Sequence, residues 1–208
     1  MPGQMMHLYV GNCLWQEQGL RGNRSQFLLG CIAPDGVNAK GFAPKKVRWR
    51  AHLRARDLGV WKENALRFYQ GQQGVIPWEY LLGYLVHVYT DILWDELFNP
   101  QLERSIRALT QDEDKRDFLR WSELFLFDRL ACFQDWWKHG ARREFARARA
   151  LDINGISSTM IELLQKDTLF WYANTIEEQY GTAPPCFVTQ IQAENLASAV
   201  IEQVNICE

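Results

Sequence analysis

Apolar residues recur at steps of three and four along most of the chain, as they do in amphipathic helices. The clearest run covers residues 77–98, where Leu81, Leu85, Val88 and Ile92 fall on one stripe. The same spacing predicts further helices around His7 near the N-terminus and over residues 48–56, 62–72, 112–137, 141–151, 157–179 and 188–206. Breaks are expected where proline and glycine interrupt the pattern, at Asn99–Pro100, Gly181 and Pro184–Pro185.

Strand signals are nearly missing from this pattern, because alternating apolar and polar runs bounded by turns hardly occur. The sequence therefore predicts an all-α fold, built as a helical bundle. A chain of 208 residues, 47% of them hydrophobic, can bury one core, and no repeat or linker divides it. We expect a single domain over residues 1–208, with the polar chemistry in about residues 1–98 and the later helices as a packing wall.

Three polar residues interrupt the apolar helix at 77–98. His87, Asp91 and Asp95 stand at i, i+4 and i+8, so they project from one face about one turn apart. An imidazole and a carboxylate at this spacing can reach one divalent cation, or can hydrogen-bond to each other. The spacing alone leaves both interpretations open.

Further candidate ligands come earlier in the chain. His7 lies near the N-terminus, Asp35 ends the apolar run "FLLGCIAPDG", and His52 lies in "RWRAHLRARD". Taken singly, each has a plain structural interpretation, since a helical histidine usually packs and an aspartate after proline usually bonds to its own turn. Together with His87 and Asp91 they form a set of nitrogen and oxygen donors that suits Zn²⁺ or a similar transition metal.

Two polar residues are left outside this set. His139, in "WWKHGARRE", is expected near a helix C-terminus, where a cation complements the helix dipole. Asp95 is expected beside the ligands or at the surface.

The segments that carry the five candidates resemble motifs of the zinc-dependent phospholipase C family, in particular its small bacterial members. The similar segments are the run "FLLGCIAPDG", the histidine of "AHLRARD" and the helix "YLLGYLVHVYTDILW", which fits the family pattern G-Y-(L/A)-x-H-x-x-x-D. His7 corresponds to an early histidine of the family. The resemblance covers about the first half of the chain and implies a phospholipase C/nuclease-like bundle.

The resemblance also implies a metal centre. Asp35, His52, His87 and Asp91 would meet at one metal, and His7 with a bridging Asp91 would support a second. The wider superfamily, which includes single-strand nucleases, uses three zinc ions and a further downstream HxxxE helix, and this chain has no such sequence. We therefore expect one or two ions of zinc, or of another divalent transition metal.

The charges of the site agree with a cation. Asp35 and Asp91 would repel each other without one, whereas Zn²⁺ neutralises them and lowers the pKa of a bound water toward neutrality. Asp35 comes from a turn and not from the ligand helix, so we expect it to orient or deprotonate that water. Lys46, Arg50 and Arg54 belong to a basic stretch without acidic residues and would collect an anionic substrate.

The expected function is hydrolysis of a phosphoester, in the manner of phospholipase C, through a metal-activated water. A phosphohydrolase of the HD type fits less well, because no His-Asp doublet occurs. The alternative from another class is a non-catalytic helical protein with a structural metal site or a partner-binding role. A phospholipid head group, a nucleotide or another phosphoester would each present the same anion.

Charge and composition narrow the partners. A net charge of −2 gives no global attraction to nucleic acid, so a small-molecule or lipid phosphoester is the expected substrate. The longest apolar segment contains charged residues, which argues against a transmembrane segment. The N-terminus lacks a signal-peptide pattern and the five cysteines form no CxxC pair, so we expect a cytoplasmic protein.

Overall fold

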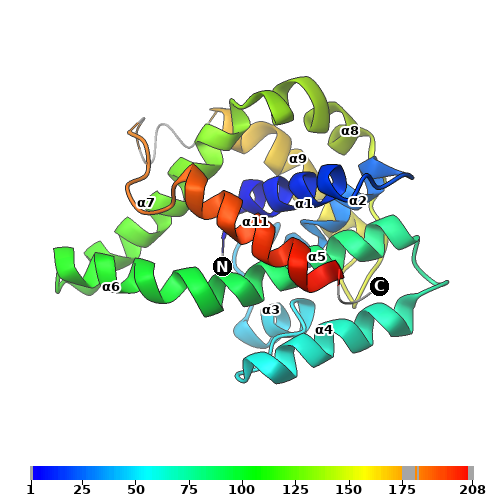
Figure 1. Cartoon of the computed structure of the whole chain (residues 1–208), viewed down its shortest axis with the longest axis horizontal. Helices are drawn as coiled ribbons and strands as arrows, with labels where there is room; N and C mark the ends of the chain where they lie inside the picture. The colour runs from blue at the N-terminus through cyan, green and yellow to red at the C-terminus, as the bar shows by residue number, and fades with distance from the viewer. Residues whose placement is uncertain (1, 175–180, 182, 206–208) are drawn as a thin grey trace.

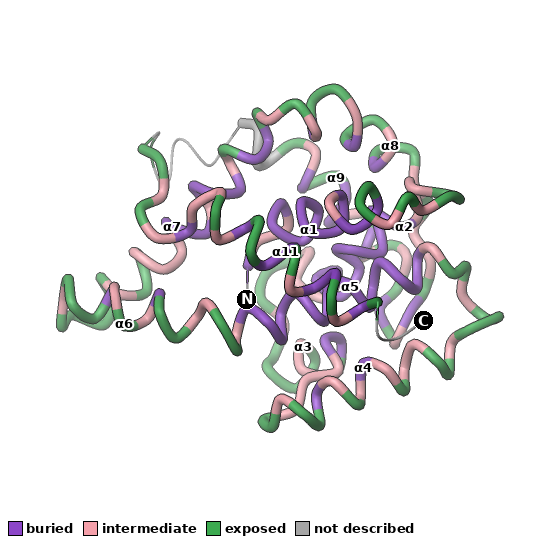
Figure 2. Tube along the Cα trace, in the orientation of Figure 1, coloured by how far each residue is buried: buried purple, intermediate pink, exposed green. Residues whose placement is uncertain are grey.

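The helix that carries His87 and Asp91 runs through the middle of the molecule. This helix, α5 (Trp78–Leu93), is buried at every residue from Tyr80 to Leu93. Its N-terminus is fixed by Glu79, whose carboxylate accepts the backbone N–H of Asn23 at 2.8 Å. Figure 1 shows α5 surrounded by the other helices, and Figure 2 shows the buried residues concentrated along it.

The computed structural model describes residues 2–174, 181 and 183–205. Its elements besides α5 are α1 (Gln4–Glu17), α2 (Arg24–Gly30), the 3-10 helix η1 (Ala33–Asn38), α3 (Lys45–Ala51), α4 (Leu58–Gln72), the π-helical turn η2 (Trp94–Phe98), α6 (Asn99–Leu109), α7 (Glu113–Cys132), the π-helical turn η3 (Trp137–Ala141), α8 (Arg142–Arg147), α9 (Ser158–Asn174) and α11 (Gln190–Asn205). These residues form isolated β-bridges but no strand. The predicted all-α fold is therefore confirmed.

Helices α2 and α5 cross at very short range, because each presents a glycine to the other. A Cβ atom on Gly30 would lie far inside van der Waals contact with the carbonyl oxygen of Tyr80. A Cβ atom on Gly83 would overlap the carbonyl oxygen of Phe27 in the same way. The two backbones can approach this closely only where neither residue has a side chain.

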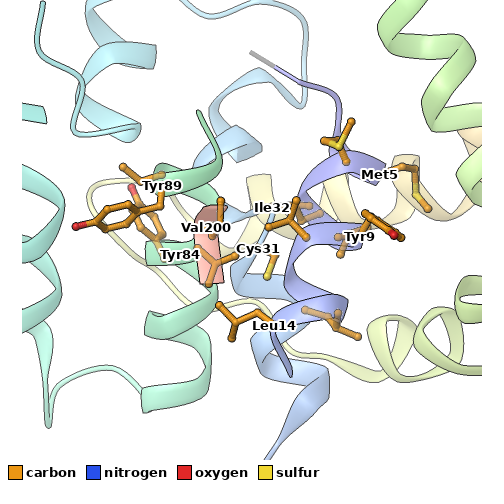
Figure 3. Packing of buried hydrophobic residues seen from close by; sticks show 14 of the residues in the cluster. Met5, Tyr9, Leu14, Cys31, Ile32, Tyr84, Tyr89 and Val200 are labelled. Carbon is orange, nitrogen blue, oxygen red and sulfur yellow. The ribbon is translucent and has the colours of Figure 1, made fainter. Parts of the chain in front are cut away.

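The core fills the space between α1, α2, α5 and α11. Figure 3 shows members of this core from each helix: Met5 and Leu14 of α1, Ile32, which follows α2, Tyr84 of α5 and Val200 of α11. All five are buried. Because α11 comes from the C-terminal part of the chain and α1 from the N-terminal part, this core joins both ends of the described sequence.

The helix boundaries differ from the sequence prediction in several places. The expected break at Asn99–Pro100 is wrong, since the chain continues from α5 through η2 into α6, with Pro100 in the first turn, where its missing N–H costs nothing. The predicted helix at 141–151 ends at Arg147, and the one at 112–137 ends at Cys132. The predicted helix at 157–179 runs partly outside the described residues. No helix of the described chain is long and apolar enough to cross a membrane.

We expect the close crossing of α2 and α5 to be sensitive to a single methyl group. Gly83→Ala should lower the free energy of unfolding by about 1–3 kcal/mol, the usual cost of overpacking a core, because backbone atoms would have to separate. Denaturant unfolding of the two purified proteins measures the difference.

The matched control is Gly71→Ala in α4. A Cβ atom there meets nothing within 4 Å, so the change should be neutral or stabilise by up to about 1 kcal/mol through helix propensity. A Gly83→Ala protein as stable as the wild type would contradict the packing argument.

Candidate metal centre

Five ionisable side chains from four segments meet beside α5. His7 lies in α1, Asp35 in η1, and His87 and Asp91 in α5, while His52 is the residue that caps the C-terminus of α3. All five are buried, and Asp35 is the most accessible at 5% exposed. The structure therefore brings together the complete set of ligands that the sequence suggested.

Asp91 lies at the middle of the cluster. Its Oδ1 is 3.4 Å from Nε2 of His7, and its Oδ2 is 3.7 Å from Nε2 of both His52 and His87. The second carboxylate, Asp35, has its Oδ1 3.2 Å from Nε2 of His52. The carboxylate of Asp91 thus faces all three imidazoles: Oδ1 is nearest to His7, and Oδ2 to His52 and His87.

The donor atoms form two overlapping sets of three. His7, His87 and Asp91 make one, and Asp35, His52 and His87 make the other; within each set the donor atoms lie within 4.8 Å of one another. His87 belongs to both sets. The grouping implied by the family resemblance instead joined Asp91 with Asp35, His52 and His87, and paired His7 with Asp91 alone.

Backbone carbonyls fix the orientation of two imidazoles. Nδ1 of His87 lies 2.8 Å from the carbonyl oxygen of Cys31, and Nδ1 of His52 lies 2.8 Å from that of Arg48. A carbonyl only accepts, so each Nδ1 carries the proton and each Nε2 presents a lone pair to the cluster when the ring is neutral. Metal-binding histidines commonly use this same second hydrogen bond.

Local structure explains why the carbonyl of Cys31 is available. Helix α2 ends at Gly30, so the carbonyl of Cys31 is not needed for a helical hydrogen bond, and the Gly30–Gly83 crossing places it beside His87.

Helix α1 is held at its N-terminus by the buried Asp128, which accepts the N–H groups of Met5 and Met6 at 3.3 and 3.2 Å. That cap sets the position of His7.

Burial dominates the protonation of the cluster. Burial raises the pKa of Asp91 to about 7. It lowers the pKa of His7 to about 3 and that of His87 well below the ordinary value, and the charge of a neighbouring histidine lowers each of them further. For Asp35 burial is again the largest single cause and raises the pKa, but the hydrogen bond with His52 and the charges of His87 and His52 together outweigh it, so the pKa falls. For His52 burial lowers the pKa, but the hydrogen bond with Asp35 and the charges of Asp91 and Asp35 together outweigh it, so the pKa rises. Two of the three imidazoles are therefore neutral near pH 7, as metal ligands must be.

Several buried atoms of the cluster lack a hydrogen bond within the described chain. They are both ring nitrogens of His7, Nε2 of His87 and both carboxylate oxygens of Asp91. Leaving such groups unsatisfied in an apolar interior costs free energy. A divalent cation among them would satisfy all of these atoms except Nδ1 of His7, and three imidazoles with two carboxylates are the donor set that transition metals accept.

A cavity of about 870 Å³ opens beside the cluster, and Asp35 is the one member of the five that lines it. The wall combines cationic, acidic and apolar side chains from both halves of the chain. They include Arg48, Arg54, Arg120, Asp95, Glu103, Asp167, Phe42, Trp121, Leu124, Phe125, Leu164 and Phe170. The sequence did not indicate that α7 and α9 contribute side chains to this wall, because their residues show only ordinary helical spacing.

The remaining predicted residues fall in different places. Arg54 lies on the cavity wall and is paired with Asp95, while Arg50 lines a separate, smaller groove. Lys46 is exposed and lines neither cavity, whereas the neighbouring Arg48 does line the larger one. His139 is exposed, 3.6 Å from Asp135, and takes no part in the cluster.

Comparison of the chain with protein-family models, with curated proteins and with solved structures found no match. The chemistry of the site therefore has to be inferred from its geometry.

We expect the purified protein to contain one or two equivalents of zinc or a comparable divalent ion per chain, since the cluster offers two overlapping donor sets. Elemental analysis after mild purification measures this. Less than about 0.1 equivalent, with none taken up on adding zinc, would contradict a metal centre.

Replacing His87 or Asp91 by alanine should lower the bound metal strongly, because His87 belongs to both donor sets and Asp91 faces all three imidazoles. Asp95→Ala and His139→Ala are the controls, and both should keep the wild-type metal content. Equal losses in Asp91→Ala and Asp95→Ala would show that the ligand register is displaced by one helical turn.

Proposed function

We propose that the chain is a divalent-metal-dependent hydrolase of phosphoesters, with phosphodiester hydrolysis of the phospholipase C type as the reaction. One observation carries the proposal: a buried cluster of imidazoles and carboxylates borders a large cavity through a single carboxylate, Asp35, and arginines line the same cavity. A metal donor set, a carboxylate at the cavity wall and nearby cations are what hydrolysis of an anionic ester requires.

The residues that would hold the ion are His7, His52, His87 and Asp91, with Asp35 at the edge of the set. Zinc bound here would supply a Lewis acid for a phosphoryl oxygen and would lower the pKa of a coordinated water toward neutrality. The protein contributes ligand orientation through the carbonyls of Cys31 and Arg48.

Asp35 would orient a water molecule that enters from the cavity, because it is the member of the cluster that lines this cavity. Its Oδ1 lies 3.2 Å from Nε2 of His52 and accepts from Nδ2 of Asn38 at 3.4 Å, and these two contacts fix the plane of the carboxylate. Burial raises the pKa of Asp35, but the hydrogen bond with His52 and the positive charges nearby together lower it below its ordinary value, so the group is ionised and accepts hydrogen bonds at neutral pH.

The cavity wall would bind the rest of the ester. Arg48 lines the cavity and its side chain donates to the carbonyl of Ala43 at 3.0 Å, which leaves further N–H groups for a phosphate. Arg120 is engaged by Glu103 and Asp117, so it contributes less positive charge. The apolar surfaces of Trp121 and Phe125 would contact the organic part of the substrate.

A second candidate function is a purely structural metal site. The observation that favours it is burial, since His7, His52, His87 and Asp91 are each at most 1% exposed and structural sites are usually closed. In that case the ion would connect α1, α3 and α5 without taking part in a reaction.

Asp35→Asn should separate these two functions. The amide keeps the size of the side chain and one oxygen, so at least part of the metal should remain, whereas hydrolysis of a nitrophenyl phosphodiester should fall by about 10²-fold, the usual scale for a general base. Metal content and turnover are measured on the same preparation. A metal-loaded wild type that hydrolyses no phosphoester or phospholipid across a broad panel would favour the structural site.

A further inference from the structure

A second, smaller cavity lies beside the turn that carries His52. It is a groove of about 440 Å³ that shares only Arg54 with the wall of the larger cavity. Its walls come from the end of α3 and the turn after it, from one face of α4 and from the loop before α9. The lining residues are Trp49, Arg50, Leu53, Arg54, Asn64, Arg67, Phe68 and Asn154.

The groove carries positive charge that the described chain does not neutralise. Arg50 and Arg67 are exposed, and neither has a carboxylate within ion-pair distance among the residues described. Arg54 differs from them, because it is paired with Asp95. The two unpaired guanidinium groups therefore present planar sets of N–H donors, which match the oxygens of a phosphate.

Aromatic rings complete the walls. Asn64, Arg67 and Phe68 stand at i, i+3 and i+4 of α4 and so share one helix face. Trp49 approaches from α3, on the other side of the groove. Cations on one wall beside apolar rings suit a ligand with an anionic group attached to a flat or apolar body.

Backbone strain is concentrated at this groove. Leu53 and Asn154, with φ of 55° and 51°, are the non-glycine residues of the described chain that adopt positive φ, and both line it. The side chain of Asn154 donates to the carbonyl of Arg50 at 2.9 Å, and that of Asn64 donates to the carbonyl of Leu53 at 3.3 Å. These two hydrogen bonds hold the two turns in place. Strained residues fixed in this way are typical of ligand-binding sites.

We propose that this groove binds a small molecule that carries a phosphate group. Arg50 and Arg67 contact the phosphate, and the body of the ligand packs between Trp49 and Phe68. The site is distinct from the cavity beside the metal centre and needs no metal, so it stands whether or not the chain hydrolyses phosphoesters.

Calorimetric titration of the purified protein with AMP tests the proposal, and the Arg50 and Arg67 variants separate binding in the groove from binding of the phosphate at the metal centre. In about 0.15 M salt, AMP should bind with a Kd of about 1 mM or lower, and adenosine, which lacks the phosphate, should bind at least about tenfold more weakly. Arg50→Gln and Arg67→Gln should each weaken AMP binding by about tenfold or more.

The control variant is Arg104→Gln, which changes an arginine of α6 that is also exposed but lines neither cavity. It should bind AMP as the wild type does. The proposal is overturned if the wild type shows no AMP binding, if adenosine binds equally well, or if the Arg50 and Arg67 variants bind AMP as tightly as Arg104→Gln.

Discussion

The close crossing of α2 and α5 is the contact on which the rest of the structure depends. It requires glycine at both Gly30 and Gly83, and it places the carbonyl of Cys31 against His87 one turn further along α5. The same crossing positions η1, and with it Asp35, at the edge of the cluster. The orientation of a ligand and the packing of the core thus follow from one backbone contact.

The second constraint is the free energy of burying charge. Two carboxylates and three imidazoles are removed from water, and the described chain supplies hydrogen bonds for only part of their capacity. An arrangement of this kind destabilises a fold unless it is compensated. A cation among Asp91, His7 and His87 would offset that cost, which makes the cluster itself the strongest reason to infer a metal.

The sequence predicted the helical class, most of the longer helices and the members of the cluster, but not their surroundings. Helical spacing is a local property, and the i, i+4 step of His87 and Asp91 already fixes a shared face. The cavity wall was not predictable, because Arg120 and Trp121 line the same cavity as Asp35 only through tertiary packing. The continuation of the helix past Asn99 was missed for a different reason: proline is tolerated in a first turn, and η2 absorbs the irregularity.

The depth of the cluster also determines how quickly an ion could be exchanged. Four of the five donors are sealed from solvent, and Asp35 alone lines the larger cavity, so an ion released from Asp91 would have to pass Asp35 or wait for α1 to move. Helix α1 is held by the cap at Asp128 and by packing against α11. The residence time of a bound ion would therefore be set by opening of the fold and not by ligand strength alone, and chelators would remove it slowly.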